Sequence, residues 1–322
     1  MNIGRYQHTA STLADGQVLV AGGCYGGSCN SAELYNPSTG NWTSTGNTSI
    51  IRGYHAASTL ANGSVLVSGG WYTTAVYLNS AELYNPSTGT WTTTGNMSVT
   101  RGYHTASTLA DGEVLVTGGY NSAALNSAEL YNPSTGSWIT TGNMSVARIG
   151  HTASTLADGQ VLVASGCYGD PCNSAELYNP STGSWITTGN MSVARIGHTA
   201  SILANGSVLV AGGYSSSNGY LNSAELYNPS TGIWATTGNM NVARSQHTAS
   251  ILANGLILVA GGGNSTSYLN SAELYNPSTG IWTTARSMNV ARIWHTASPL
   301  TNGSVLVAGG CCGAASNSAE LY

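Results

Sequence analysis

The chain consists of seven copies of one unit. A histidine marks each copy and recurs at intervals of 47, 49, 47, 47, 49 and 48 residues. The run N-S-A-E-L-Y also occurs once in every copy. A period of about 40 to 50 residues with paired glycines and a spaced tryptophan is typical of β-propellers, in which each repeat forms one blade. The 322 residues therefore predict one closed all-β ring instead of two separate domains.

Each copy divides into four predicted strands. In the copy that begins at Met144, H-T-A-S-T-L is the first strand, and Asp-Gly makes a tight hairpin to the second strand, V-L-V-A-S-G. S-A-E-L-Y is the third strand, and N-P-S-T-G turns the chain into W-I-T-T, the fourth. Small residues come first and aromatic residues last, which places the first strand at the axis and the fourth at the rim. The predicted antiparallel blades are residues 1–47, 48–96, 97–143, 144–190, 191–239, 240–287 and 288–322.

The seventh blade lacks its fourth strand within this chain. The fourth-strand tryptophan occurs six times, and the sequence stops at Tyr322, where N-P-S-T-G would follow. Met1 aligns with the methionine that lies seven residues before the histidine in later copies. We expect one of two completions: a segment preceding Met1 folds back as the missing strand, or another subunit donates a strand and builds an oligomer or filament.

Charged residues are few and follow the repeat. The chain has eight arginines, no lysine and a net charge of −4, and seven arginines and seven glutamates each occupy one repeat position. This leaves no basic patch for nucleic acid, and no apolar run is long enough to span a membrane. We expect the arginines and glutamates to be buried pairs that tie strands or blades together, with a charged binding ring as the alternative. For the seven histidines, a hydrogen bond to the neighbouring blade is preferred over a ring that holds a metal or an anion.

The repeat resembles that of the kelch family. The matching features are the glycine pairs, the run E-L-Y-N-P, the tryptophan six residues after that asparagine, and A-R-x-x-H. Ser165 replaces the first glycine of the pair in the fourth copy. The resemblance covers the whole chain, implies a kelch β-propeller, and is nearest to galactose-oxidase-like and bacterial secreted proteins. It leaves the function open, because kelch propellers include enzymes, substrate adaptors and structural proteins.

An oxidase of the galactose-oxidase type would need copper held by histidine and tyrosine, with a tyrosine modified by a cysteine. Every histidine of this chain is a repeat histidine, and the cysteines lie in loops. No G-x-S-x-G, H-E-x-x-H or phosphate-loop motif occurs. We therefore predict no catalytic residue, cofactor or metal site, and keep a copper enzyme as the less favoured alternative.

Four of the six cysteines bracket short loops between the second and third strands. Cys24 and Cys29 lie at the two ends of one loop, and Cys167 and Cys172 lie at the two ends of another. This arrangement predicts two disulfides and an oxidising compartment. Cys311 aligns with Cys24, and Cys312 follows it directly. Because blade seven adjoins blade one, a four-thiolate zinc site there is an alternative to a disulfide with a vicinal or intermolecular pair.

The sequence also contains nine N-x-S/T sequons. With the predicted disulfides and the absence of lysine, they favour a secreted, extracellular glycoprotein. No signal peptide is visible at Met1. The sequon asparagines are Asn41, Asn47, Asn62, Asn96, Asn143, Asn190, Asn205, Asn264 and Asn302.

Two segments of the repeat vary between copies. The loops between the glycine pair and N-S-A hold six to eight residues and contain most of the aromatics that the copies do not share. The two residues before each histidine also vary. In an up-and-down blade both segments emerge at the same end, so they predict a binding face, and kelch adaptors similarly bind their targets there. The predicted binding residues are Tyr25, Tyr54, Trp71, Tyr72, Tyr77, Tyr103, Tyr120, Tyr168, Tyr214, Tyr220, Tyr268 and Trp294.

These features favour a non-enzymatic extracellular kelch propeller that acts as an interaction or structural glycoprotein. Its expected partner is a protein or a second copy of the chain. The alternative is a lectin-like propeller, because exposed tyrosine and tryptophan rings can stack on sugars.

Overall fold

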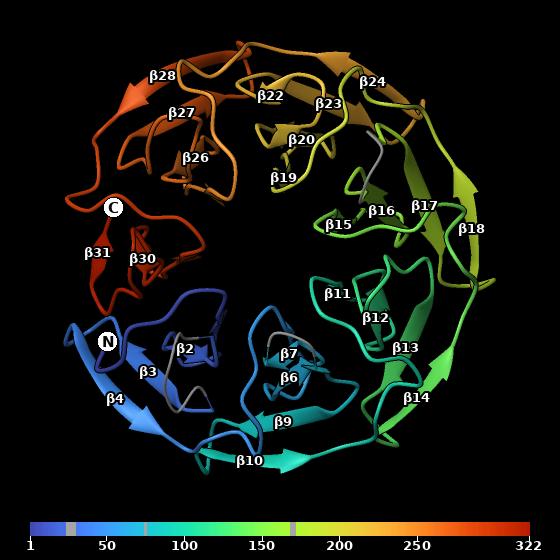
Figure 1. The fold of residues 1–322 in the computed structure, drawn as a ribbon, viewed down its shortest axis with the longest axis vertical. Helices are drawn as coiled ribbons and strands as arrows, with labels where there is room; N and C mark the ends of the chain where they lie inside the picture. Colours follow the sequence, from blue (N-terminus) through green and yellow to red (C-terminus); the bar gives the residue numbers. More distant parts are fainter. Residues whose placement is uncertain (24–29, 74–75, 168–171) are drawn as a thin grey trace.

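The computed structural model describes residues 1–23, 30–73, 76–167 and 172–322, and these form a ring of seven blades (Figure 1). Six blades are four-stranded antiparallel sheets, and the seventh has three strands. The predictions for Cys24, Tyr25, Cys29 and Tyr168 concern positions outside the described residues. Among the described residues there is no helix of the length and hydropathy needed to cross a bilayer.

The strands follow the chain order blade by blade, and each main strand has three to five residues. Two short hairpins lie in the loops between second and third strands: β7 (Trp71–Thr73) with β8 (Val76–Tyr77), and β21 (Tyr214–Ser215) with β22 (Gly219–Tyr220). Blade one contains β1 (Thr9–Thr12), β2 (Val18–Ala21), β3 (Ala32–Asn36) and β4 (Asn41–Thr45), and blade two contains β5 (Ala56–Thr59), β6 (Val65–Ser68), β9 (Ala81–Asn85) and β10 (Thr90–Thr93). Blade three contains β11 (Thr105–Thr108), β12 (Val114–Thr117), β13 (Ala128–Asn132) and β14 (Ser137–Thr140), blade four contains β15 (Thr152–Thr155), β16 (Val161–Ala164), β17 (Ala175–Asn179) and β18 (Ser184–Thr187), and blade five contains β19 (Thr199–Ile202), β20 (Val208–Ala211), β23 (Ala224–Asn228) and β24 (Ile233–Thr236). Blade six contains β25 (Thr248–Ile251), β26 (Ile257–Ala260), β27 (Ala272–Asn276) and β28 (Ile281–Ala285), and blade seven contains β29 (Thr296–Pro299), β30 (Val305–Ala308) and β31 (Ala319–Leu321).

The predicted order of strands from axis to rim is confirmed. The first strands line the axis and the fourth strands form the rim (Figure 1). Each first strand packs against the first strands of both neighbouring blades, and β1 contacts β29, so the inner layer is a closed circle. Every residue of the seven second strands is buried, which explains their continuous apolar sequence.

The hydrophobic core lies between adjacent blades. Val208 and Tyr227 of blade five pack against Leu156, Leu162 and other residues of blade four, and the other blade contacts repeat this arrangement. The third-strand tyrosine and fourth-strand tryptophan of each complete blade lie side by side, with ring centroids 5.0 or 5.1 Å apart. The outer aromatics therefore fill the widening gap between blades and do not simply cover the rim.

Blade seven is open at the rim but closed at the axis. β31 pairs with β30 and has no fourth-strand partner among the described residues, as the sequence predicted. The N–H of Gly310 nevertheless donates to the carbonyl of Arg5 at 2.7 Å, and the amino group of Met1 donates to the carbonyl of Asn317 at 3.0 Å. The two chain ends therefore lie close together (Figure 1).

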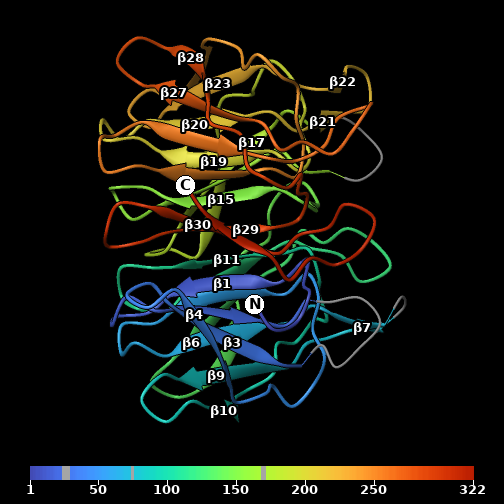
Figure 2. The ribbon, with the colours of Figure 1, turned by 90° about the vertical axis from the view of Figure 1, so that its left-hand side faces the viewer.

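The two faces of the ring differ. The hairpins β7–β8 and β21–β22 project from the side shown on the right of Figure 2. We call this side the loop face. The other side, which we call the turn face, has the A-D/N-G and N-P-S-T-G turns, whose asparagine side chains cap the turn backbone, as Asn132 does for Ser134.

Candidate functional site

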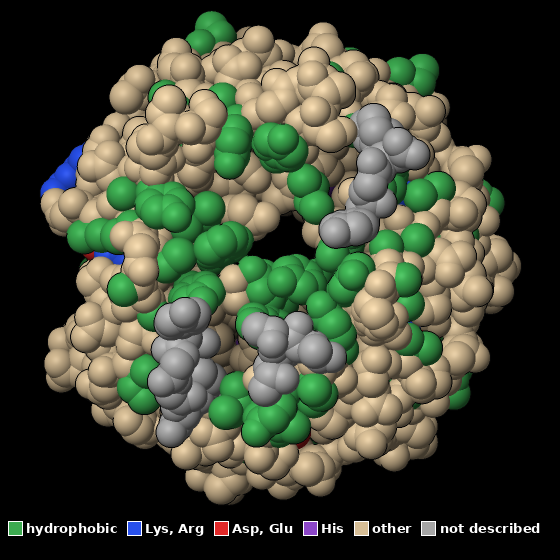
Figure 3. Space-filling view, in the orientation of Figure 1, with side chains coloured by type: hydrophobic (Ala, Val, Ile, Leu, Met, Phe, Trp, Pro, Cys, Tyr) green, Lys and Arg blue, Asp and Glu red, His purple; other side chains and the backbone are tan. Residues whose placement is uncertain are grey.

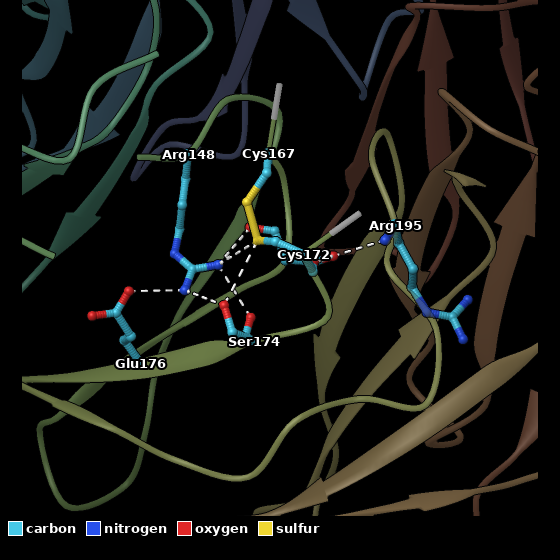
Figure 4. The surroundings of a disulfide bond; sticks show 7 residues. Arg148, Cys167, Cys172, Ser174, Glu176 and Arg195 are labelled. Atoms are coloured by element: carbon cyan, nitrogen blue, oxygen red, sulfur yellow. Dashed lines mark hydrogen bonds and ion pairs between the residues drawn. A yellow bond between two sulfur atoms is a disulfide. The ribbon is translucent and has the colours of Figure 1, made fainter. Parts of the chain in front are cut away.

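The repeated arginines and glutamates are buried ion pairs, which confirms the structural interpretation. In blade four, Arg148 is fully buried and lies 2.8 Å from Glu176 (Figure 4). Its guanidinium also donates to the carbonyls of Ser165 and Ser174, so it joins the connector before the first strand to the second and third strands. Burial lowers the pKa of the Arg148 side chain, and Glu176 opposes this effect. All seven pairs have the same geometry.

The repeated histidines join neighbouring blades, as predicted. The Nε2 atom of His198 lies 3.0 Å from the hydroxyl of Thr152 in blade four, and His8 makes the same contact with Thr296 of blade seven. The Nε2 atom of His104 instead contacts the hydroxyl of Ser68 in the neighbouring blade. Burial, followed by the nearby Arg195, lowers the pKa of His198 to about 3. These rings are therefore neutral at physiological pH, and their Nε2 atoms are already hydrogen-bonded.

The side chain of Ser165 makes hydrogen bonds that the glycines at the same position of other repeats cannot make. It has a φ of 57°, in the left-handed region, and is fully buried. Its hydroxyl donates to the carbonyl of Cys172 and accepts from the N–H of Arg195, both at 2.8 Å. In several other blades a leucine carbonyl satisfies that arginine N–H, as Leu221 does for Arg244. The serine hydroxyl thus bridges the N–H of Arg195 and the carbonyl of Cys172, the residue at the position of that leucine.

Cys167 and Cys172 are joined by a disulfide, with Cα atoms 5.7 Å apart (Figure 4). This agrees with their predicted hairpin position. Cys311 is a free, buried cysteine, and burial raises the pKa of its thiol, whereas Cys312 is free and exposed. The zinc alternative depends on Cys24 and Cys29, which lie outside the described residues.

In five of the repeats, the described residues of the two variable segments meet on the loop face. Gly53, from the pair before His55, exchanges two backbone hydrogen bonds with Trp71, the first residue of the loop between the second and third strands. Equivalent bridges join Gly102 to Tyr120 and Ile196 to Tyr214. The sequence placed both segments at one end of the blade; the structure adds that they are hydrogen-bonded to each other.

The second residue of each variable pair forms a continuous hydrogen-bonded circle around the channel mouth. The N–H of Tyr54 donates to Gln7, that of Tyr103 to Tyr54, and the series continues blade by blade. The N–H of Gln7 donates to Trp294 at 3.2 Å and closes the circle. We call these seven residues the mouth annulus: Gln7, Tyr54, Tyr103, Gly150, Gly197, Gln246 and Trp294.

All seven annulus residues have left-handed backbone dihedrals, with φ between 51° and 65°. This conformation directs each N–H toward the preceding blade, and it is strained for the five members that are not glycine. Glycine would avoid the strain at every position, and Gly150 and Gly197 do so. The other five positions keep the strained backbone conformation and have a side chain at the channel mouth.

The annulus surrounds a hollow of about 320 Å³. Tyr54, Tyr103 and Trp294 supply aromatic rings, Gln246 supplies an amide, and the histidine layer lies below. The rings of Tyr54 and Tyr103 are tilted by 31° with centroids 3.8 Å apart, and burial raises the pKa of Tyr54. Figure 3 shows the opening at the centre of the loop face, with hydrophobic side chains along much of its rim and almost no charged ones beside it. The described residues that line the hollow are thus mainly aromatic rings and neutral histidines, with one side-chain amide and no charged group.

Other predicted binding residues surround the annulus. Trp71 lies 6.1 Å from Tyr54, ring to ring, and Tyr77 lies 5.6 Å from Tyr120. Farther out, four tyrosines on the loops are exposed, and these are Tyr72, Tyr214, Tyr220 and Tyr268. Sequence reasoning did not include Gln7, Gln246, Gly150 and Gly197 in the site. Their signal was present, because they occupy the same variable position as Tyr54.

Eight sequon asparagines are exposed, and Asn264 is partly buried. Asn62, Asn205 and Asn302 lie in turns of the turn face, and their side chains accept a hydrogen bond from a serine N–H two residues later. Asn47, Asn96, Asn143 and Asn190 follow the fourth strands, and Asn41 begins β4. Asn264 lies in a loop between a second and a third strand, on the loop face.

Two family models match the sequence. The Attractin/LZTR1 beta-propeller matches residues 1–218, and the KLHDC2/KLHL20/DRC7 Kelch-repeats domain matches residues 150–321. The chain belongs to the kelch-repeat β-propeller family. No curated protein matches it.

Among solved structures, the chain is similar to a novel fungal alcohol oxidase with catalytic diversity among the AA5 family, in complex with copper. The TM-score is 0.79 at 20% identity, over 96% of this chain and 71% of that one, so the likeness concerns the fold. The donor set needed for copper does not fit the part of the chain that the structure describes. Among the described residues, no three histidine, cysteine or acidic side chains gather as ligands, and the histidine Nε2 atoms contact hydroxyls of neighbouring blades.

Proposed function

We propose that this protein is a non-enzymatic binding propeller that captures a protein partner on the loop face, with the mouth annulus at the centre of the contact. The kelch fold supports an interaction role. The observation that carries the proposal is the strained annulus, in which aromatic and amide side chains occupy positions where glycine would be less strained. The exposed tyrosines around it supply the large, amphipathic contact area that is enriched in protein interfaces.

Substitutions on the loop face, compared with substitutions at the rim, test this function. Trp294→Ala and Trp71→Ala should each weaken partner binding by tenfold or more, by about 1.4 kcal/mol or above, as expected for aromatic residues at the centre of an interface. Matched controls are Ile139→Ala and Ile186→Ala, which remove exposed apolar side chains from the rim. If the rim or turn-face substitutions abolish binding while both tryptophan variants bind normally, the loop face is not the contact surface.

The uncharged hollow favours a second candidate, a saccharide ligand. Aromatic faces next to amide groups suit a sugar ring, which has apolar faces and hydroxyls at its edge. A glycan array measured with the intact chain distinguishes the candidates. Saccharide binding that Tyr103→Ala abolishes supports the second, whereas a silent array with retained protein binding supports the first.

An extracellular location is also part of the proposal. The Cys167–Cys172 disulfide is the kind of bond that persists in oxidising compartments, and eight of the nine sequon asparagines are exposed. Mass analysis of the protein from its native source, before and after glycosidase treatment, should reveal attached glycans. An unmodified mass together with free thiols would contradict the extracellular assignment.

A further inference from the structure

The mouth annulus has one aromatic arc and one arc that is nearly bare. Trp294, Tyr54 and Tyr103 line the hollow with rings, whereas Gly150 and Gly197, which come next around the circle, have no side chain. Hydrophobic side chains lie along the left and lower edges of the opening in Figure 3. A ligand that enters the mouth therefore meets a wall of rings on one side and open backbone on the other.

The aromatic arc is held in place before any ligand arrives. The hydroxyl of Tyr54 accepts a hydrogen bond from the side-chain amide of Gln7. Its ring centroid lies 6.1 Å from that of Trp71 and 3.8 Å from that of Tyr103. Rings that are already fixed by such contacts lose little conformational entropy when a ligand packs on them.

Two hydrogen-bond donors at the mouth are left for a ligand. The nitrogen of Gln7 can only donate, so the Tyr54 hydroxyl accepts from it and gives its own hydrogen to Tyr103. The hydroxyl hydrogen of Tyr103 then has no acceptor among the described residues. The Nε2 atom of Gln246 lies over Gly197, 2.6 Å from where a Cβ atom would be, and the part of the chain that the structure describes offers it no partner either.

The other polar groups of the mouth are already used. The N–H of every annulus residue donates to the carbonyl of the preceding member, so a peptide strand cannot pair with the annulus as it does with a sheet edge. The four histidines that line the hollow use their Nε2 atoms for hydroxyls of neighbouring blades. Strand addition is therefore excluded at the mouth.

Two further modes of peptide recognition also fail to match the hollow. The described residues that line it have no charged group to recognise an acidic, basic or phosphorylated motif. Its volume of about 320 Å³ is smaller than one turn of an α-helix with side chains, which occupies about 400 to 600 Å³ for a pitch of 5.4 Å and a diameter of 10 to 12 Å. An amphipathic helix thus does not fit into it.

We propose that the partner segment received by the mouth annulus is a proline-rich stretch in the polyproline II conformation, an inference that rests on the loop-face function proposed above. Proline rings pack on the aromatic arc, and carbonyls of the segment accept from the Tyr103 hydroxyl and the Gln246 amide. Proline has no N–H, so such a segment requires donors, which the mouth supplies, and few acceptors. Its backbone is extended before binding and has no internal hydrogen bonds to break.

Fluorescence anisotropy with labelled nonaproline and the full chain tests this inference. The matched control is nonaproline made from D-proline, which has the same composition and stiffness but forms a helix of the opposite hand. The chain should bind the L-peptide about tenfold or more tightly than the D-peptide. Absence of binding, or equal binding of the two peptides, overturns the inference without the use of any variant.

Three variants locate the bound peptide. Tyr103→Phe keeps the ring and removes the donor, so it should weaken binding of the L-peptide about fivefold, the scale of one hydrogen bond. Trp294→Ala removes part of the aromatic arc and should weaken it about tenfold or more. Ile186→Ala, at the exposed rim, is the control that should bind normally. If both mouth variants are folded by thermal unfolding and bind the L-peptide as the unaltered chain does, the peptide lies elsewhere and the inference is wrong.

The same measurements separate this inference from the loop-face function. If L-nonaproline does not bind but Trp71→Ala weakens binding of the partner, the loop-face function stands and the proline-rich segment is rejected. If L-nonaproline binds at the annulus but partner binding survives both tryptophan substitutions, the loop-face function is overturned and the assignment of the mouth to proline-rich segments is kept. Saccharide binding without binding of L-nonaproline overturns the inference in favour of the second candidate.

Discussion

The segment from Arg148 to His151 contains two kinds of residue that serve opposite purposes. Arg148 and His151 are the same in all seven copies and are buried in ion-pair and hydrogen-bond contacts that hold blades together. Ile149 and Gly150, between them, differ from copy to copy, and Gly150 lies at the channel mouth. Residues that are copied through a ring build the scaffold, whereas those that vary on that scaffold distinguish one sector of the face from another.

Acid should destabilise the scaffold more than any single substitution, because it acts on all seven histidines at once. The pKa of His151 in the folded chain is about 3, below its usual value of 6.5, because burial disfavours the charged ring. The unfolded chain therefore binds more protons between pH 6.5 and 3, and stability falls as pH decreases through this range. Each histidine should contribute up to about 1.4 kcal/mol per pH unit to the slope.

Urea unfolding at several pH values measures this effect. The free energy of unfolding should be constant above pH 7 and decrease progressively below pH 6.5. His151→Gln should reduce the slope by about one seventh, through loss of one of seven similar groups. A flat profile down to pH 4 would contradict neutral, buried histidines.

Loss of one buried ion pair should have the next largest effect. Arg148→Ala leaves Glu176 buried without its partner and should destabilise the chain by about 3 to 5 kcal/mol. The matched control is Arg286→Ala, at the one arginine outside the seven pairs, which should change stability by no more than about 0.5 kcal/mol. Similar effects of both substitutions in denaturant unfolding would remove the distinction between scaffold and surface arginines.

The disulfide should contribute less. Cys167→Ser with Cys172→Ser opens a loop of six residues and should cost about 2 kcal/mol by the loop-entropy relation. Ser165 should limit further damage, because its hydroxyl continues to satisfy the Arg195 N–H. Thermal unfolding of the oxidised protein and the double variant provides the measurement. A loss as large as that of Arg148→Ala would indicate that the loop is part of the scaffold.

Substitutions in the annulus should have the smallest effect on stability. Gln246→Gly relieves a left-handed backbone conformation but increases the freedom of the unfolded chain, so the net change should lie within about 0.5 kcal/mol. Ligand binding should nevertheless decrease, because the amide is lost from the hollow. A large loss of stability with unchanged binding would assign Gln246 to the scaffold.

The sequence alone determined the architecture and the scaffold. Seven copies with a fixed alternation of turns and strands can bury their apolar strands only by stacking around an axis, and the strand order follows from residue size. It also predicted that the repeated arginines, glutamates and histidines are structural. An ionisable residue that is present in every blade must be accommodated identically seven times, which favours a partner within the repeat or its neighbour.

Only the tertiary structure decided what happens where blades meet. The circle of hydrogen bonds through Tyr54 and Tyr103 joins residues 47 to 49 positions apart, and its left-handed dihedrals depend on the angle between adjacent blades. The need for glycine at position 189 likewise arises only because the carbonyl of Gly232, in the next blade, lies against it. Local propensities contain no information about such distances, because these distances arise only when the ring closes.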